Sequence, residues 1–171
     1  MGNILDNASR RGLLLGGGAA AAVAAGFIRP AFAFSETSPA DVNVDAQGVA
    51  LRGHDPVAYQ TQNRPVPGLA QFTATYEGAT YRFASAANRD AFRANPARYA
   101  PAFGGFCAMG VAMGRKLDGD PTLFRVVDNR LYLNVSAPVQ QRWLQDIPGN
   151  IRAANERWPA LRGRTPQQTN Q

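Results

Sequence analysis

Two stretches of alternating hydrophobic and polar positions predict a pair of β-hairpins. The first covers residues 72–83, where the alternation is interrupted by Glu77-Gly78 and then resumes. The second covers residues 123–134, with a turn expected at Asp128-Asn129. Alternation with a period of two, broken by short turn dipeptides, is typical of antiparallel hairpins with one buried face.

Helical periodicity and capping residues predict the elements around these hairpins. Ser85 is suited to cap a helix over residues 86–94, and Asn95-Pro96 opens a short helix that ends at Tyr99. Apolar residues spaced by three and four run from Val139 to Trp158, with a break expected at Pro148. The pattern predicts a single small α+β domain in which two antiparallel hairpins form a sheet packed by short helices. No internal repeat of 20 to 50 residues stands out.

The first 33 residues resemble an export signal. Arg10-Arg11 precedes an uncharged Gly/Ala-rich run that ends at Ile28, and Ala31-Phe32-Ala33 follows as a small-x-small site. Paired arginines before such a core are typical of twin-arginine signals, so we expect cleavage after Ala33 and a periplasmic protein. The alternative is a membrane anchor, but the run is short of the roughly 20 apolar residues that a span needs. We therefore expect a signal at 1–33, a tether at 34–41, a domain at 42–161 and a disordered tail at 162–171.

Charge argues against a nucleic-acid partner. Removal of the signal leaves 15 basic and 11 acidic residues, a net charge of +4. These basic residues are scattered, and Arg115-Lys116 is their only adjacent pair. A nucleic-acid groove would show clustered Lys and Arg. We also expect no membrane span once the signal is cleaved.

The single cysteine, Cys107, lies in an unusual segment. Residues 104–114 contain four glycines among apolar residues, which predicts a buried backbone rather than a regular helix. Three roles are open for Cys107. It is a small buried hydrophobe, a soft metal ligand, or a redox thiol whose thiolate is stabilised by exposed backbone N–H groups and which needs a partner. In the second role, Met109, Met113 and the single histidine, His54, could complete a set that suits Cu(I).

His54 has two further interpretations. It is a turn residue bonded to local backbone, or a general base paired with Cys107. No third orienting group is evident in the sequence, so we expect a binding protein rather than an enzyme.

Several ordered motifs resemble the exported YHS domain-containing (seleno)protein family over residues 45–160. They are Gly-His-Asp-Pro-Val-Ala-Tyr at 53–59, Tyr-Arg-Phe-Ala-Ser at 81–85, Gly-Gly-Phe-Cys-Ala at 104–108 and Asp-Asn-Arg-Leu-Tyr-Leu-Asn at 128–134. The resemblance implies a small metal-binding module. Many such domains carry cysteines where this chain has Ala58, Ala84 and Ala87, so metal binding by those positions is not implied. The selenoprotein label instead implies a reactive or soft-ligand role for Cys107.

The sequence therefore predicts a periplasmic YHS-type binding module for a soft metal ion, copper first, held by Cys107 with Met109, Met113 or His54. The alternatives are a thiol-redox protein that uses Cys107 and a metal-free structural or partner-binding domain.

Overall fold

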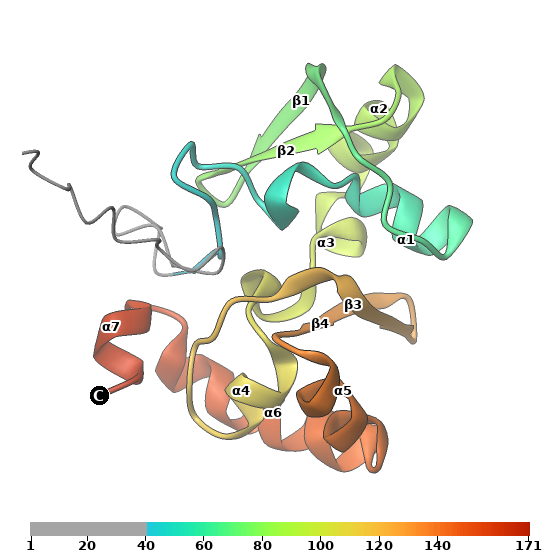
Figure 1. Ribbon diagram of the computed structural model, residues 1–171. Helices are drawn as coiled ribbons and strands as arrows, with labels where there is room; N and C mark the ends of the chain where they lie inside the picture. The colour runs from blue at the N-terminus through green and yellow to red at the C-terminus, as the bar shows by residue number, and fades with distance from the viewer. Residues whose placement is uncertain (1–40) are drawn as a thin grey trace, which may run out of the picture.

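The computed structural model describes residues 41–171 (Figure 1). The expected signal and almost all of the expected tether lie outside these residues. The described chain contains two hairpins and several short helices, which confirms the α+β class and the single small domain. The elements are η1 (Leu51–Gly53), α1 (Pro56–Gln62), β1 (Leu69–Tyr76), β2 (Ala79–Phe83), α2 (Ala86–Ala94), α3 (Pro96–Tyr99), η2 (Ala102–Gly105), α4 (Ala108–Ala112), β3 (Asp120–Val127), β4 (Arg130–Asn134), α5 (Ala137–Leu144), α6 (Ile147–Leu161) and α7 (Pro166–Thr169).

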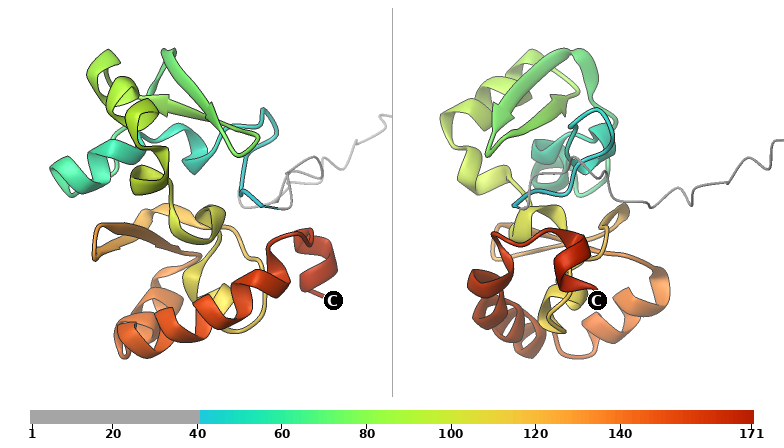
Figure 2. Two further views of the ribbon diagram at one scale, coloured as in Figure 1. Left: turned by 180° about the vertical axis from the view of Figure 1, so that it is seen from behind. Right: turned by 90° about the vertical axis from the view of Figure 1, so that its left-hand side faces the viewer.

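The two hairpins form two separate antiparallel sheets rather than the single sheet that we expected. Strand β1 pairs with β2, and β3 pairs with β4. The turns fall at Glu77-Gly78 and Asp128-Asn129, as the sequence predicts. In each hairpin the register shifts near the start of the first strand. Helices lie beside each sheet on its own side of the molecule (Figure 2).

One arrangement of elements occurs twice in the chain, in a first half from η1 to α3 (residues 51–99) and a second half from η2 to α6 (residues 102–161). Equivalent positions in the two halves are 51 or 52 residues apart. In each half a 3-10 turn leads into a short helix, then a hairpin, then two helices. Figure 1 shows the first half above, in blue to green, and the second below, in yellow to red. The two 3-10 turns have the same backbone path, because residues 51–53 and residues 103–105 all have positive φ. This offset lies just beyond the 20 to 50 residues over which the sequence shows no repeat.

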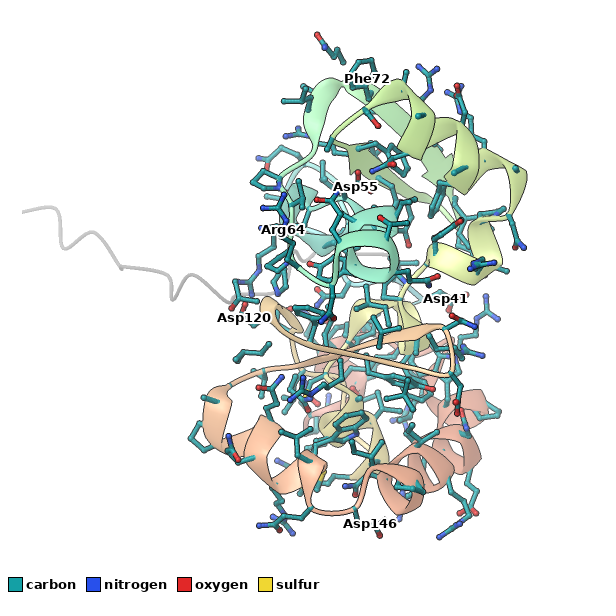
Figure 3. The ribbon with its side chains drawn as sticks, turned by 90° about the vertical axis from the view of Figure 1, so that its right-hand side faces the viewer. Asp41, Asp55, Arg64, Phe72, Asp120 and Asp146 are labelled. Carbon is teal, nitrogen blue, oxygen red and sulfur yellow. The ribbon has the colours of Figure 1, made fainter. Side chains whose placement is uncertain are left out.

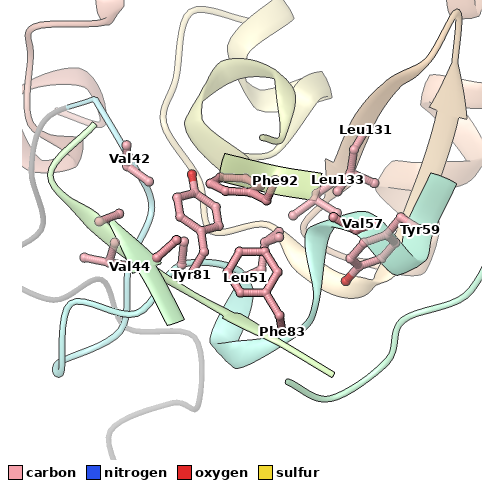
Figure 4. Packing of buried hydrophobic residues seen from close by; sticks show 13 residues of the cluster. Val42, Val44, Leu51, Val57, Tyr59, Tyr81, Phe83, Phe92, Leu131 and Leu133 are labelled. Atoms are coloured by element: carbon pink, nitrogen blue, oxygen red, sulfur yellow. The ribbon is translucent and has the colours of Figure 1, made fainter. Parts of the chain in front are cut away.

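Strand β4 lies between two hydrophobic cores. Leu131 and Leu133 belong to the core of the first half, whereas Tyr132 belongs to the core of the second. Successive side chains of a strand point to opposite faces, so one strand can serve both cores. Figure 4 shows Leu131 and Leu133 beside Val57 and Phe92. The two halves are therefore held together by buried apolar contact.

Helix α4 lies in a segment where we expected no regular helix. The glycine-rich segment 104–114 is buried as expected, but five of its residues form a short regular helix. Gly110 fits inside this helix because a Cβ there would press against Leu117 and the Arg115 carbonyl. The helix then ends at Met113, and Gly114 continues with a φ of 82°.

The C-terminal tail is ordered, contrary to expectation. Residues 166–169 form α7, and the Asn170 side chain donates to the Lys116 carbonyl at 2.6 Å. The Lys116 ammonium is buried and donates to the carbonyls of Arg162 and Arg164, both at 2.7 Å. A polar tail can order in this way because its backbone carbonyls satisfy a buried cation. Among the residues that the structure describes, no helix is long and apolar enough to cross a membrane.

Candidate functional site

Asp55 caps the first helix of the first half and is completely buried (Figure 3). Its Oδ1 accepts hydrogen bonds from the backbone N–H groups of Val57 at 2.9 Å and Ala58 at 3.4 Å. Its Oδ2 accepts from the Ala84 backbone at 2.8 Å and from the Asn88 side chain at 2.6 Å. A buried carboxylate is tolerated when several donors surround it. Asp55 thereby joins α1, the end of β2 and α2.

Cys107 occupies the equivalent position in the second half. It caps α4, is completely buried, and its Sγ accepts a hydrogen bond from the Gly110 backbone at 3.3 Å. The backbone N–H groups of Met109 and Val135 also act to lower the pKa of the thiol. These three donors correspond in position to those that serve the Asp55 carboxylate. The second half therefore holds a thiol in a set of backbone donors that holds a negative charge in the first half.

Burial and backbone donors act in opposite directions on the Cys107 thiol. Burial is the larger effect and raises its pKa, while the N–H groups of Gly110, Val135 and Met109 favour the thiolate and lower it. In the absence of a bound cation the thiol is therefore the stable form at neutral pH. A cation at the sulfur would reverse this balance, because the anionic form would then be paired.

Asn134 is the polar side chain next to this sulfur. It is completely buried at the end of β4, and its Oδ1 lies 3.8 Å from Cys107 Sγ, which donates to it. Its Nδ2 has no hydrogen-bond partner among the described residues. An unmatched buried N–H group is unusual in a native structure. The Asn134 Nδ2 is thus a hydrogen-bond donor near Cys107 that the thiol does not use.

The other predicted metal ligands are dispersed. Met109 is buried in the same cluster as Cys107, whereas Met113 is 56% exposed at the end of α4. His54 lies in the first half, where its Nδ1 is 3.0 Å from the Leu51 carbonyl and its backbone bridges to Pro67. No group of three or more His, Cys, Asp or Glu side chains within residues 41–171 is arranged to hold a metal ion. The donors that fit a soft ion are therefore Cys107 and, from the same cluster, Met109.

A polar cavity of about 280 Å³ between the halves was not anticipated from the sequence. Its charged lining residues are Asp45, Arg52 and Asp118. Burial raises the pKa of Asp118 to about 6, while Arg52 and the Asn43 amide act to lower it. No local motif marks these residues, since they come from separate segments that meet only in the folded chain. The remaining lining residues are Asn43, Val44, Ala46, Leu51, Gly105, Gly119 and Leu133.

Comparison with known proteins identifies the first half. The family model described as the YHS domain matches residues 57–103, from α1 to η2. These residues are therefore similar to the YHS domain, and the match covers less than half of the chain. The second half, with Cys107, lies outside the match. No curated protein matches the chain significantly, and no solved structure does.

Proposed function

We propose that this protein is an exported, periplasmic YHS-type module that binds a soft metal ion, copper first, at the Cys107 sulfur, and that it is not an enzyme. The observation that carries the proposal is the equivalence of Cys107 with Asp55. Each caps a short helix and accepts a hydrogen bond from the backbone N–H group three residues later. Two further backbone N–H groups, at equivalent positions in the two halves, donate to the Asp55 carboxylate and act to lower the pKa of the Cys107 thiol. A set of donors that holds a carboxylate is suited to hold a thiolate.

The thiolate is the form of cysteine that binds metals, and thiolate with thioether suits Cu(I). Met109 lies in the same buried cluster and supplies a thioether. Met113 and His54 are secondary in this proposal, because one is at the surface and the other makes its contact with Leu51. Because the free thiol has a raised pKa, binding would release a proton and strengthen with rising pH.

The test is an anaerobic Cu(I) titration of the folded, mature chain against a competing chelator. We expect about one equivalent to bind, and Cys107→Ser to weaken binding at least about tenfold, because a hydroxyl is a poor soft ligand. Met109→Leu should weaken binding less, and Met113→Leu, at an exposed position, is the matched control. Equal uptake by wild type and Cys107→Ser would refute the site.

The metal-free structural or partner-binding role is the second candidate. The complete burial of Cys107 favours it. In that case wild type binds no stoichiometric copper, and Cys107→Ser changes only the free energy of unfolding. A redox thiol would require access to the sulfur, and the sequence contains no second cysteine to resolve an oxidised form. Rapid alkylation of Cys107 in the native protein would favour that role over both others.

Export is tested separately. Replacing Arg10-Arg11 by Lys-Lys should leave the precursor in the cytoplasm if the twin-arginine route is used. Fractionation of cells that produce the two forms measures this. Normal processing of the Lys-Lys form would assign export to another route without affecting the copper proposal.

A further inference from the structure

The cavity between the two halves has a floor built by glycines. A Cβ at Gly119 would collide with the Gly105 carbonyl, and Gly105 itself has a φ of 83°. The backbones of the two segments therefore approach closely and leave space above them. Figure 3 shows Asp120, the residue that begins β3 directly after Gly119, at the boundary between the halves.

Two of the three charged residues that line this space, Arg52 and Asp118, are not required by the repeated fold. Arg52 occupies the middle of the first 3-10 turn, where the second half has Gly104. Asp118 forms an antiparallel β-bridge with Phe106, and the equivalent β-bridge of the first half joins Pro67 to His54. Arg52 also has a φ of 48°, a region that favours glycine. Leu51 and Phe103 share this positive φ, so it belongs to the repeated turn, and position 52 is distinguished by its arginine side chain. The chain thus departs from its own repeat at two positions, and both line the same cavity.

Burial of the Asp118 carboxylate in this cavity costs free energy. It is only 6% exposed. Its pKa is raised to about 6, so at neutral pH it is a buried carboxylate whose burial is only partly offset by Arg52 and Asn43. A cationic group in the cavity would offset the rest of the cost of burying the Asp118 carboxylate.

We infer that this cavity is a binding site for a small zwitterion of the α-amino acid class, with its ammonium group at Asp118 and its carboxylate at Arg52. The Asp45 carboxylate already accepts hydrogen bonds from the backbone N–H groups of Gln47 and Val49. Of the other two charged residues, Asp118 would repel a purely anionic ligand and Arg52 a purely cationic one. A zwitterion pairs with both signs. The volume of about 280 Å³ lies just below the range of about 300–1,000 Å³ of drug-sized sites, so the ligand is small.

The test is calorimetric and thermal-shift titration of the mature chain with the standard L-α-amino acids. For the amino acid that binds best, the analogues that lack the amine or the carboxylate are then titrated. We expect both analogues to bind at least about tenfold more weakly than the zwitterion. Failure of every amino acid to bind at millimolar concentration overturns the proposal, as does equal binding of either analogue.

Two variants locate the site. Asp118→Asn and Arg52→Gly should each weaken binding at least about tenfold. Arg52→Gly introduces at position 52 the glycine that the second half has at the equivalent position, 104, so the variant should still fold. Asp90→Asn and Arg125→Gln, at exposed positions, are the charge-matched controls. Unchanged binding by both cavity variants would refute the assignment. Cys107→Ser should bind the amino acid normally, since Cys107 is not among the cavity residues.

Discussion

The Asp55 carboxylate and the Cys107 thiol cap equivalent helices, and each accepts a hydrogen bond from the backbone N–H group three residues later. The N–H groups of Val57 and Ala84 also donate to the carboxylate, and their equivalents, Met109 and Val135, act to lower the pKa of the thiol. In the first half Asn88 adds a side-chain donor at 2.6 Å, and in the second half Asn134 lies next to the sulfur. Equivalent positions thus hold a carboxylate in one half and a thiol in the other.

Asp55 should be essential for stability. Asp55→Ala removes the acceptor for two helix N–H groups, the Ala84 N–H and the Asn88 side chain, all at a completely buried position. We expect a loss of about 3 kcal/mol or more, since each unmatched buried donor costs about 1–3 kcal/mol. Urea unfolding followed by circular dichroism measures it. Asp55→Asn retains one acceptor oxygen and should lose less; an equal loss in the two variants would contradict this account.

Cys107→Asp tests the equivalence directly. The new carboxylate would receive the N–H groups of Gly110, Met109 and Val135, and the Asn134 Nδ2 could donate to it as Asn88 donates to Asp55. At pH 7 we expect Cys107→Asp to be more stable than Cys107→Ala, which accepts no hydrogen bond, and to lose that advantage on acidification as the carboxylate protonates. Thermal melts at pH 7 and pH 3 compare the two variants. A lower melting temperature for the Asp variant at pH 7 would show that the second half cannot hold a charge at this position.

Asp118 should make the protein less stable as pH rises through the weakly acidic range. Its pKa is raised from 3.8 to about 6, so between these values the folded state binds more protons than the unfolded state. Stability therefore falls from about pH 4 to pH 6, by up to about 3 kcal/mol for a shift of this size. Asn43, Asp45 and Arg52 face the same cavity and are unchanged in Asp118→Asn.

Asp118→Asn should remove this pH dependence and be more stable than wild type at pH 7. Chemical denaturation at several pH values compares the two proteins. An identical pH dependence in wild type and variant would show that Asp118 titrates normally. A stability gain on removal of Asp118 would also fit a residue kept for binding rather than for folding.

The first hairpin turn should tolerate asparagine but not valine at Gly78. Gly78 has a φ of 77°, and its equivalent in the second hairpin is Asn129, with a φ of 57°. Asparagine is tolerated in this region, whereas a β-branched residue is not. We expect Gly78→Val to cost about 1 kcal/mol or more and Gly78→Asn to cost less. Melting temperatures of the two variants decide this, and equal values would contradict the role given to φ.

The sequence alone determined the local elements, because their signals are local. Alternation indicated both hairpins, and Ser85 and Asn95 indicated the starts of two helices. The expected break into two helices is present, but it falls at residues 145–146, and Pro148 lies in the first turn of α6. Each of these depends on residues within a few positions of one another. The stretch Gly-His-Asp-Pro-Val-Ala-Tyr at residues 53–59 is likewise continuous in the chain and lies on the first turn and helix.

Only the tertiary structure decided how these elements combine. The separation of the hairpins into two sheets, the docking of α7 on Lys116 and the exposure of Met113 depend on contacts between distant segments. The repeat was hidden because equivalent positions differ in residue type, as with Asp55 and Cys107, while sharing backbone conformation and hydrogen bonds. The cavity was hidden because Arg52 and Asp118 are 66 positions apart in the chain. Backbone geometry and long-range burial determine these features, and neither is expressed in the spacing of residues along the sequence.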